Sequence, residues 1–289
     1  MGDSVEFDVV VVGSCNLDLV STTTHLPSPG ETLRAVSYAE HAGGKGLNQA
    51  VACARMGART AFIGCVGNDS AGTMLRDLLN AEGIDTSQLV SVNAPTGRAF
   101  ITVDASGENT IVIVAGANAH VGDTRFTVPP SKVLLAQLEI QLDVVTRVFA
   151  QAHNAITVLN PAPAAPLSAE LLSLCDYAVP NENEAAALGG TQFLLGAGVT
   201  TVVTTLGERG AEISDNTTTV EVAPYPIHAI DTVGAGDAFV GALCAEIARG
   251  ETIEHAAQIA SIAGALATTV QGAVPSLPTR AAVMSLYAD

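Results

Sequence analysis

Residues 7–15, FDVVVVGSC, form a mostly β-branched run in which polar and apolar positions do not alternate. A strand with one face in water alternates with a period of two. An unbroken apolar run is instead typical of a strand that is covered on both faces. Strands of that kind belong to parallel sheets with helices packed on each side, so this run limits the possible folds more than any other stretch of the chain.

The rest of the chain repeats this pattern. Further strands are predicted at 59–67, 132–139, 155–160, 176–181 and 200–207, and helices at 46–57, 69–82, 142–153, 182–189, 237–249 and 253–270. This alternation predicts an α/β fold, a three-layer, doubly wound and mostly parallel sheet. Ligands of such sheets bind at the carboxyl ends of the strands, so the residues that follow each strand are the first candidates for a site.

Two segments have no helix to cover their second face. Residues 97–116 contain two β runs around an Asp-Ala-Ser-Gly turn, as in a hairpin, and residues 18–42 are predicted to be extended chain with turns. We expect these segments to form a small β-sheet lid on a single α/β domain that spans residues 1–289. The lid is also the expected contact of a homodimer.

Charge and composition limit the partners. The chain has 29 acidic and 12 basic residues, a net charge of −17, and such a field repels the phosphates of nucleic acids and of anionic lipids. We therefore expect small-molecule ligands and neither a nucleic-acid nor a membrane partner. No charged residue lies between His255 and Arg280, but the polar residues and alanines there favour a buried helix and a loop over a membrane span.

The expected compartment is the cytoplasm. The first ten residues are acidic where a secretory signal would be basic. The five cysteines are scattered, with no Cys-x-x-Cys pair and no histidine at metal-binding spacing, which is typical of reduced core residues.

A glycine-rich turn opens the predicted helix 46–57. In the stretch AGGKGLNQAVACARMGA, glycines flank Lys45 and Asn48 follows. A Walker A loop is excluded, because position 39 is Ala and position 46 is Gly. The glycines fit a plain tight turn, and they also allow backbone amides to approach a polyol, whose hydroxyls suit the donor and acceptor of Asn48. Both interpretations stand.

Polar side chains follow two strands in the first half of the chain. Asn16 and Asp18 come after the first strand, and their spacing makes both side chains point the same way in extended chain. Glu139 ends the strand 132–139. These residues fit turns and helix caps, or a ligand site at the carboxyl edge of the sheet.

Two later strands end in comparable motifs. Asn181 and Glu184 have the spacing Asn-x-x-Glu, which fits the first turn of a helix or a Mg²⁺ site that keeps several waters. Thr205 and Gly207 lie at the end of the strand 200–207, where they fit either a hairpin or a contact to a nucleotide phosphate.

The stretch DTVGAGDAFVGAL, residues 231–243, places two carboxylates around a glycine turn that leads into a helix. Amides at the start of that helix would point out of it and form an anion hole for a phosphoryl group. Asp237 could then take a proton from a hydroxyl nucleophile. The alternative is a helix N-cap worth about 1 kcal/mol, which explains neither the glycines nor Asp231.

These motifs resemble the ribokinase family of PfkB-type carbohydrate kinases. Lys45 with its glycines and Asn48 is similar to the first signature of the family, and the nine residues DTVGAGDAF are similar to the second, which is highly specific. The likeness runs from about residue 7 to about 278 and includes PTGRAF, GENT, AGAN, QLE, NPAPA, PNENE and TLGERGA.

The resemblance implies ATP-dependent phosphorylation of D-ribose at its 5-hydroxyl, with Mg²⁺ and an activating K⁺. Asp237 would be the base, beneath an anion hole of backbone amides at Gly234, Ala235 and Gly236. The sugar would be held by Asn16, Asp18, Gly44, Lys45, Gly46, Asn48 and Glu139. ATP would border Asn181, Thr205, Leu206, Gly207, Gly210, Gly236 and Ser261. Glu184 would place Mg²⁺. K⁺ would be held, mostly by carbonyls, at Asp231, Val233, Ala267, Val270, Gly272 and Ser276.

The chain departs from the family pattern in a few places. Segments 120–131 and 191–198 are short, so one or two peripheral helices are expected to be trimmed, and position 261 is Ser where relatives can carry His or Asn. A kinase for another sugar or a nucleoside remains the nearest alternative. A sugar-binding regulator without catalysis is the other, although it would need neither Asp237, the glycine pair nor the Asn-x-x-Glu motif.

Overall fold

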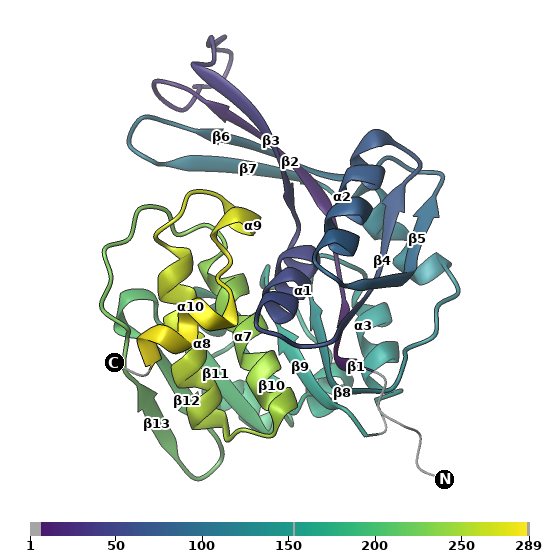
Figure 1. The fold of residues 1–289 in the computed structure, drawn as a ribbon, viewed down its shortest axis with the longest axis vertical. Coiled ribbons are helices and arrows are strands. Elements are labelled where there is room, and N and C mark those ends of the chain that lie inside the picture. Colours follow the sequence, from purple (N-terminus) through teal and green to yellow (C-terminus); the bar gives the residue numbers. More distant parts are fainter. Residues whose placement is uncertain (1–6, 153, 288–289) are drawn as a thin grey trace.

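The computed structural model describes residues 7–152 and 154–287 (Figure 1). A nine-stranded sheet crosses it in the order β13-β12-β11-β10-β9-β8-β1-β4-β5. Only the pairs β11–β12 and β12–β13 are antiparallel. In chain order the strands are β1 (Phe7–Val12), β4 (Thr60–Gly67), β5 (Asp85–Val92), β8 (Ser131–Gln137), β9 (Ile156–Asn160), β10 (Tyr177–Ala178), β11 (Thr201–Thr205), β12 (Ala211–Ser214) and β13 (Thr219–Val222).

The first strand shows why the sheet lies between two layers of helices. Val9 and Val11 belong to one hydrophobic core and Val10 and Val12 to the other, and all four are fully buried. The first core includes α1 (Lys45–Arg55), α2 (Ser70–Ala81), α7 (Ala235–Arg249) and α8 (Ile253–Ala267). The second includes α3 (Leu142–Phe149), α4 (Ala169–Ser173), α6 (Thr191–Gly196) and the 3₁₀ helix η1 (Gly116–Asp123). The predicted three-layer α/β class is confirmed.

The order of the strands fixes where a ligand can bind. From β1 the chain moves outward through β4 to β5, returns to β8 on the other side of β1, and continues to β11. At the carboxyl ends of β1 and β8, the loops that follow these two strands therefore lead in opposite directions. Such a switch point opens a crevice in doubly wound sheets.

A separate four-stranded sheet, in the order β3-β2-β6-β7, projects from the main body (Figure 1). Its strands are β2 (Asn16–Thr22), β3 (Ser37–Gly43), β6 (Gly97–Val103) and β7 (Asn109–Val114). The predicted hairpin at 97–116 is confirmed as the antiparallel pair β6–β7. β2 also pairs antiparallel with β3, whereas the central β2–β6 pair is parallel.

Several element boundaries differ from prediction. The strand expected at 176–181 is only the two residues of β10, because Pro180 and Asn181 lead directly into α5 (Glu182–Ala187). The helix expected at 142–153 ends at Phe149, and residue 153 lies outside the described residues. The hairpin interpretation of the segment after 200–207 is confirmed by the antiparallel pair β11–β12. Elements that the sequence did not predict are α4, α6, η1, β5, β13, α9 (Ala273–Ser276) and α10 (Arg280–Tyr287).

The two short segments take up little space. Residues 191–198 hold only the six-residue helix α6, and residues 120–131 hold the end of η1 and extended chain before β8. The stretch without charges after His255 divides into α8 and the four-residue α9. Over the part of the chain that the structure describes, no helix has the length and apolar character needed to cross a membrane.

Candidate active site

A polar pocket of about 250 Å³ lies at the carboxyl ends of β9, β10 and β11, facing the first turn of α7. It brings together residues from distant parts of the sequence. Those predicted for the site and found in its lining are Lys45, Asn181, Glu184, Thr205, Gly234, Gly236 and Asp237. The switch point between β1 and β8 adjoins this pocket through Lys45, whose amide is bonded to Glu139 after β8.

The start of α7 is built for an anion. Its N-cap is Gly234, in a left-handed conformation with φ of 83°, and no side chain caps the helix. A Cβ at this position would lie 3.0 Å from the Cα of Ala273, so the conformation and the packing both require glycine. The amide of Ala235 donates to the carbonyl of Thr232 at 3.3 Å, and no side chain takes the other amides of the first turn, which fits a phosphoryl group.

Asp237 is held from α1 rather than by its own helix. Its Oδ2 accepts a hydrogen bond from Asn48 Nδ2 and its Oδ1 accepts one from Gln49 Nε2, both at 2.9 Å. Because Gly234 is the N-cap, the capping interpretation of Asp237 is wrong. The carboxylate instead lies in the pocket next to the uncapped amides, where a base for a hydroxyl would be needed.

Two of the residues predicted to hold a sugar have buried polar atoms without partners. Asp18 Oδ1 and Asn48 Oδ1 are both buried and make no hydrogen bond within the chain. Buried acceptors of this kind are costly unless a donor reaches them, and the hydroxyls of a polyol are suitable donors. Gly43 leaves room for the Asp18 carboxylate, since a Cβ there would lie 2.1 Å from Asp18 Oδ2.

Asn118 orients Asn16 and was not singled out from the sequence. Its Nδ2 donates to Asn16 Oδ1 at 2.8 Å, while its Oδ1 accepts the amide of Cys15 at 2.9 Å. Both asparagines are at most 2% exposed. The side-chain oxygen of Asn16 thus accepts a hydrogen bond from Asn118, and its side-chain NH₂ group is the part left for a ligand. Asn118 ends the AGAN motif, which was the available signal.

Burial, together with the nearby carboxylates of Glu139 and Asp237, raises the pKa of Asp18 to about 7. Near neutral pH the Asp18 carboxyl group can therefore accept a hydrogen bond from a hydroxyl or donate one to it.

Glu139 braces the glycine turn. Its Oε2 accepts hydrogen bonds from Ser14 Oγ at 2.5 Å and from the amide of Lys45 at 3.1 Å. Ser14 Oγ in turn accepts the amide of Gly46 at 3.3 Å. Ser14 is a further site residue that the sequence reasoning missed. These bonds hold the first turn of α1 against the switch point.

The residues predicted to border a nucleotide lie mainly in local motifs. Asn181 is the N-cap of α5 and forms a reciprocal capping box with Glu184, with both bonds at 2.8 Å. Thr205 ends β11 and pairs with Asn181 in an isolated bridge. Leu206, Gly207 and Gly210 form the tight turn from β11 to β12, around the 3₁₀ helix η2 (Gly207–Arg209).

Ser261 lies elsewhere, on α8, where its Oγ donates to the carbonyl of Ala223 at 3.3 Å. It is not among the residues that line the polar pocket.

The six positions predicted for K⁺ converge on one loop region beneath α7. Asp231 Oδ2 accepts the amide of Gly272 at 2.8 Å, and its Oδ1 accepts that of Val233 at 3.0 Å. Ser276 Oγ donates to the carbonyl of Ala273, the residue that packs on Gly234. Ala267 and Val270 lie in the turn that closes α8, with Val270 N bonded to Ala267 O. Both oxygens of Asp231 thus accept backbone amides, which ties its loop to Gly272, and the K⁺ site at these positions stays a prediction.

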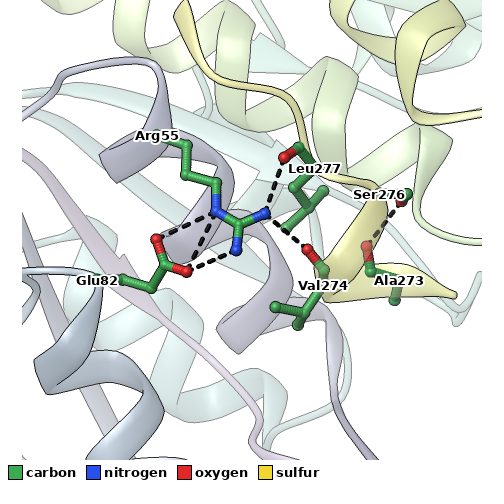
Figure 2. A network of polar contacts seen from close by, with 6 residues as sticks. All are labelled: Arg55, Glu82, Ala273, Val274, Ser276 and Leu277. Carbon is green, nitrogen blue, oxygen red and sulfur yellow. Dashed lines mark hydrogen bonds and ion pairs between the residues drawn. The ribbon is translucent and has the colours of Figure 1, made fainter. Parts of the chain in front are cut away.

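Arg55 fastens this loop to the rest of the domain (Figure 2). Its Nη1 donates to the carbonyls of Val274 and Leu277, both at 2.8 Å, and its guanidinium pairs with Glu82 at the end of α2. The bonds restrain α9, which carries Ala273 against the N-cap of α7. Arg55 is thus connected to the anion hole through one packed segment.

Within the described ranges, no group of three or more His, Cys, Asp and Glu side chains forms a metal site. Mg²⁺ in phosphoryl-transfer enzymes is commonly held by one or two carboxylates, waters and substrate phosphates, so Glu184 on the pocket wall fits such a site.

Residues 6–280 match the family model described as pfkB family carbohydrate kinase. The chain belongs to this family. It is 38% identical to a ribokinase of Haemophilus influenzae over 292 residues, which covers 94% of this chain and 95% of that protein. The fold matches a crystal structure of Thermotoga maritima ribokinase with a TM-score of 0.93 at 33% identity, covering 98% of this chain and 100% of that one. It also matches Arabidopsis thaliana ribokinase complexed with ribose and ATP, with a TM-score of 0.89 at 29% identity and coverage of 97% and 98%.

Proposed function

We propose that this PfkB-family kinase transfers the γ-phosphoryl group of ATP to the 5-hydroxyl of D-ribose, giving ribose 5-phosphate and ADP. The observation that carries the proposal is the position of Asp237, in the pocket lining beside the uncapped amides of α7. The relatives named ribokinase, and the one complexed with ribose and ATP, support ribose and ATP as the substrates.

In the proposed reaction Asp237 takes the proton of the 5-hydroxyl as its oxygen attacks the γ-phosphorus. The bond between that phosphorus and the bridging oxygen of ADP breaks, and ADP leaves. The amides of Gly234, Ala235 and Gly236 stabilise the charge on the transferring group. Phosphoryl transfer asks the protein for little beyond this positioning and charge stabilisation.

The sugar would be held at the switch point. Asp18 and Asn48 offer their unpartnered buried oxygens to hydroxyls, and Asn16 offers its amide group. The backbone of Gly44, Lys45 and Gly46 would contact the sugar from the start of α1, with Glu139 behind that turn.

ATP would lie along the ends of β10 and β11. The residues proposed to border it are Asn181, Thr205, Leu206, Gly207, Gly210, Gly236 and Ser261. Glu184 would help to place Mg²⁺, whose charge would neutralise the phosphates. The carbonyl-rich loop at Asp231, Val233, Ala267, Val270, Gly272 and Ser276 would hold K⁺, and replacing Na⁺ by K⁺ should then raise the rate. Equal rates in the two salts would contradict the cation site.

The test of the proposal is release of ADP in a coupled assay with ribose, 2-deoxyribose, fructose and adenosine. We expect the highest kcat/KM with ribose. A higher value with another acceptor would favour the alternative, a related kinase of different specificity. No ADP release with any acceptor, while sugar binding persists, would favour the regulator.

We also propose that the small sheet is a lid and the contact of a homodimer. Its register puts Ala99 and Ile113 on the same face as Asp18, toward the sugar, and Phe100 and Val112 on the opposite face. Phe100 and Val112 are 48% and 64% exposed, which is unusual for apolar residues of this size. Val112→Lys should convert a dimer to a monomer in light scattering, and a wild-type monomer would contradict the proposal.

The cytoplasm is the proposed compartment. Its support is that all five cysteines are buried and free, as expected where thiols stay reduced.

A further inference from the structure

Three buried amide side chains connect the interior of the sheet to Asp237. Asn160 at the end of β9 donates from Nδ2 to the carbonyl of Val179 at 2.8 Å. Gln49 on α1 donates from Nε2 both to Asn160 Oδ1 and to Asp237 Oδ1, each at 2.9 Å. Gln137 at the end of β8 donates from Nε2 to Gln49 Oε1 at 2.6 Å.

The carbonyl of Val179, at one end of this hydrogen-bond network, fixes which atom donates in each of its bonds. The carbonyl of Val179 can only accept, so Asn160 must present its Nδ2 there and its Oδ1 to Gln49. Gln49 must then present its amide group to Asn160 and its oxygen to Gln137. A reversed Gln49 would bring its oxygen against both Asn160 Oδ1 and Asp237 Oδ1. The network therefore keeps a donor directed at Asp237 before any substrate arrives.

Space-filling alone does not account for these residues. Gln49 and Gln137 are fully buried and Asn160 is 8% exposed. Gln137 Oε1 has no hydrogen-bond partner within the chain, which is an unfavourable state for a buried polar atom. Methionine or leucine would fill the same volume without that penalty. The amides are better explained by what they do to the carboxylate at the end of the chain.

We propose that Gln49 is a positioning residue for the phosphoryl transfer, held in its donating orientation by Asn160 and Gln137. The inference rests on the proposed role of Asp237 as the base. Gln49 and Asn48, adjacent on α1, each occupy one lone pair on a different oxygen of Asp237. The carboxylate is thereby fixed in one rotamer, with the remaining lone pairs open to the sugar hydroxyl. Misplacing reacting groups by about 1 Å can cost on the order of 100-fold in rate.

The first test is the near-isosteric variant Gln49→Met, which removes the donor while keeping the volume. We expect kcat to fall about 10- to 100-fold while the KM values for ribose and ATP stay within about threefold, because the lost contact serves the base rather than either substrate. Thr60→Val is a matched control, another buried polar-to-apolar change, at the amino end of β4. A kcat within twofold of wild type in Gln49→Met would overturn the proposal.

A second variant gives a readout that a merely structural residue would not move. Gln49→Glu puts a carboxylate against Asp237, so the acid limb of the pH profile of kcat/KM should move to higher pH. The other charged groups around Asp237 are Asp18 on β2, Glu139 after β8, Lys45 on α1 and Glu184 on α5, and all remain in the variant. An unchanged acid limb would count against the contact.

The contact can also be measured without activity. A double-mutant cycle of Gln49→Met and Asp237→Ala in chemical unfolding should show a coupling of at least about fivefold in the unfolding equilibrium constant. Coupling without a fall in kcat would overturn the positioning role, and absence of coupling would overturn the contact. A wild-type protein that phosphorylates no sugar would refute the proposed function, and with it the catalytic role of Gln49, while coupling would leave the contact established.

Discussion

The parts of the site proposed to hold the sugar and the nucleotide are built in different ways. On the proposed sugar side, Asn16 is buried and Asp237 is half-buried, and both are fixed by residues far away in the sequence, Asn16 by Asn118 and Asp237 by Gln49. On the nucleotide side, the key groups are more exposed and are fixed by neighbours, as in the capping box of Asn181 and Glu184. Under the proposed function, the reacting groups lie on the side fixed by distant residues, and the side that would admit and release a nucleotide depends on short local motifs.

The largest expected effect is that of Asp237→Asn. If Asp237 is the base, kcat should fall by about 10³-fold or more, because the amide cannot take a proton, whereas ribose binding measured by calorimetry should be largely retained. Asp77→Asn on the exposed face of α2 is a control of the same chemistry. Near-normal turnover of Asp237→Asn would show that Asp237 is not the base.

Asn118→Ala should act on the sugar alone. Loss of its bond to Asn16 leaves that side chain free to turn, so the KM for ribose should rise about 10-fold or more while the KM for ATP stays unchanged. Steady-state kinetics with each substrate varied in turn would measure both constants. An equal rise in the two would show that the sides are not independent.

Glu184→Gln tests the opposite side. Glutamine can still accept the amide of Asn181, so the capping box should persist, and only the charge proposed to place Mg²⁺ is lost. The Mg²⁺ concentration for half-maximal rate should rise about 10-fold with little change in the KM for ribose. The neighbouring Glu182→Gln removes an exposed charge that pairs with Arg209 and should leave the Mg²⁺ requirement unchanged.

Arg55→Met tests the contact between α1 and the loop that carries α9. It removes two hydrogen bonds to the loop that carries Ala273 and Ser276, so the K⁺ concentration for half-activation should rise a few-fold. The melting temperature should fall as well, since the carbonyls lose donors worth about 1–3 kcal/mol. Arg59→Met, at an exposed arginine paired with Asp8, is the matched control. A K⁺ response identical to wild type would show that this contact does not influence the cation loop.

The last prediction concerns stability rather than activity, through the pH dependence that Asp18 gives to unfolding. Its pKa is about 7 in the folded protein against 3.8 for the free side chain. Between about pH 4 and 7 the folded protein therefore keeps a proton that the unfolded chain has released, and this contribution to stability is lost as the pH rises through that window.

Asp18→Asn removes the ionisable group and with it this pH dependence. The melting temperature of the variant minus that of wild type should therefore increase from pH 5 to pH 8. Over this range the difference in unfolding free energy between the two proteins should change by at most about 3 kcal/mol, since roughly two pKa units of about 1.4 kcal/mol each lie between pH 5 and the folded pKa. A constant offset between the two proteins across this range would contradict the raised pKa.

The sequence predicted best where the signal is local or periodic. Unbroken apolar runs such as 7–15 gave the parallel sheet, because a strand buried on both faces cannot alternate. The glycines before α7 indicated exposed amides. Short pieces such as α6 and α9 were missed because four to six residues carry too little periodicity, and β13 was missed because it is the edge strand of the sheet, where patterning is weak.

By itself, the sequence determined the layered fold and predicted a site at the ends of the strands, with the residue types proposed to border a phosphoryl group. Only the tertiary structure decided that the partners of Asp237 are Asn48 and Gln49, that Glu139 holds the glycine turn, and that Gly234 rather than Asp237 begins α7. The physical reason is that these bonds join residues about 94 to 189 positions apart. A side-chain hydrogen bond depends on the angle and distance between two elements, and those follow from packing rather than from local pattern.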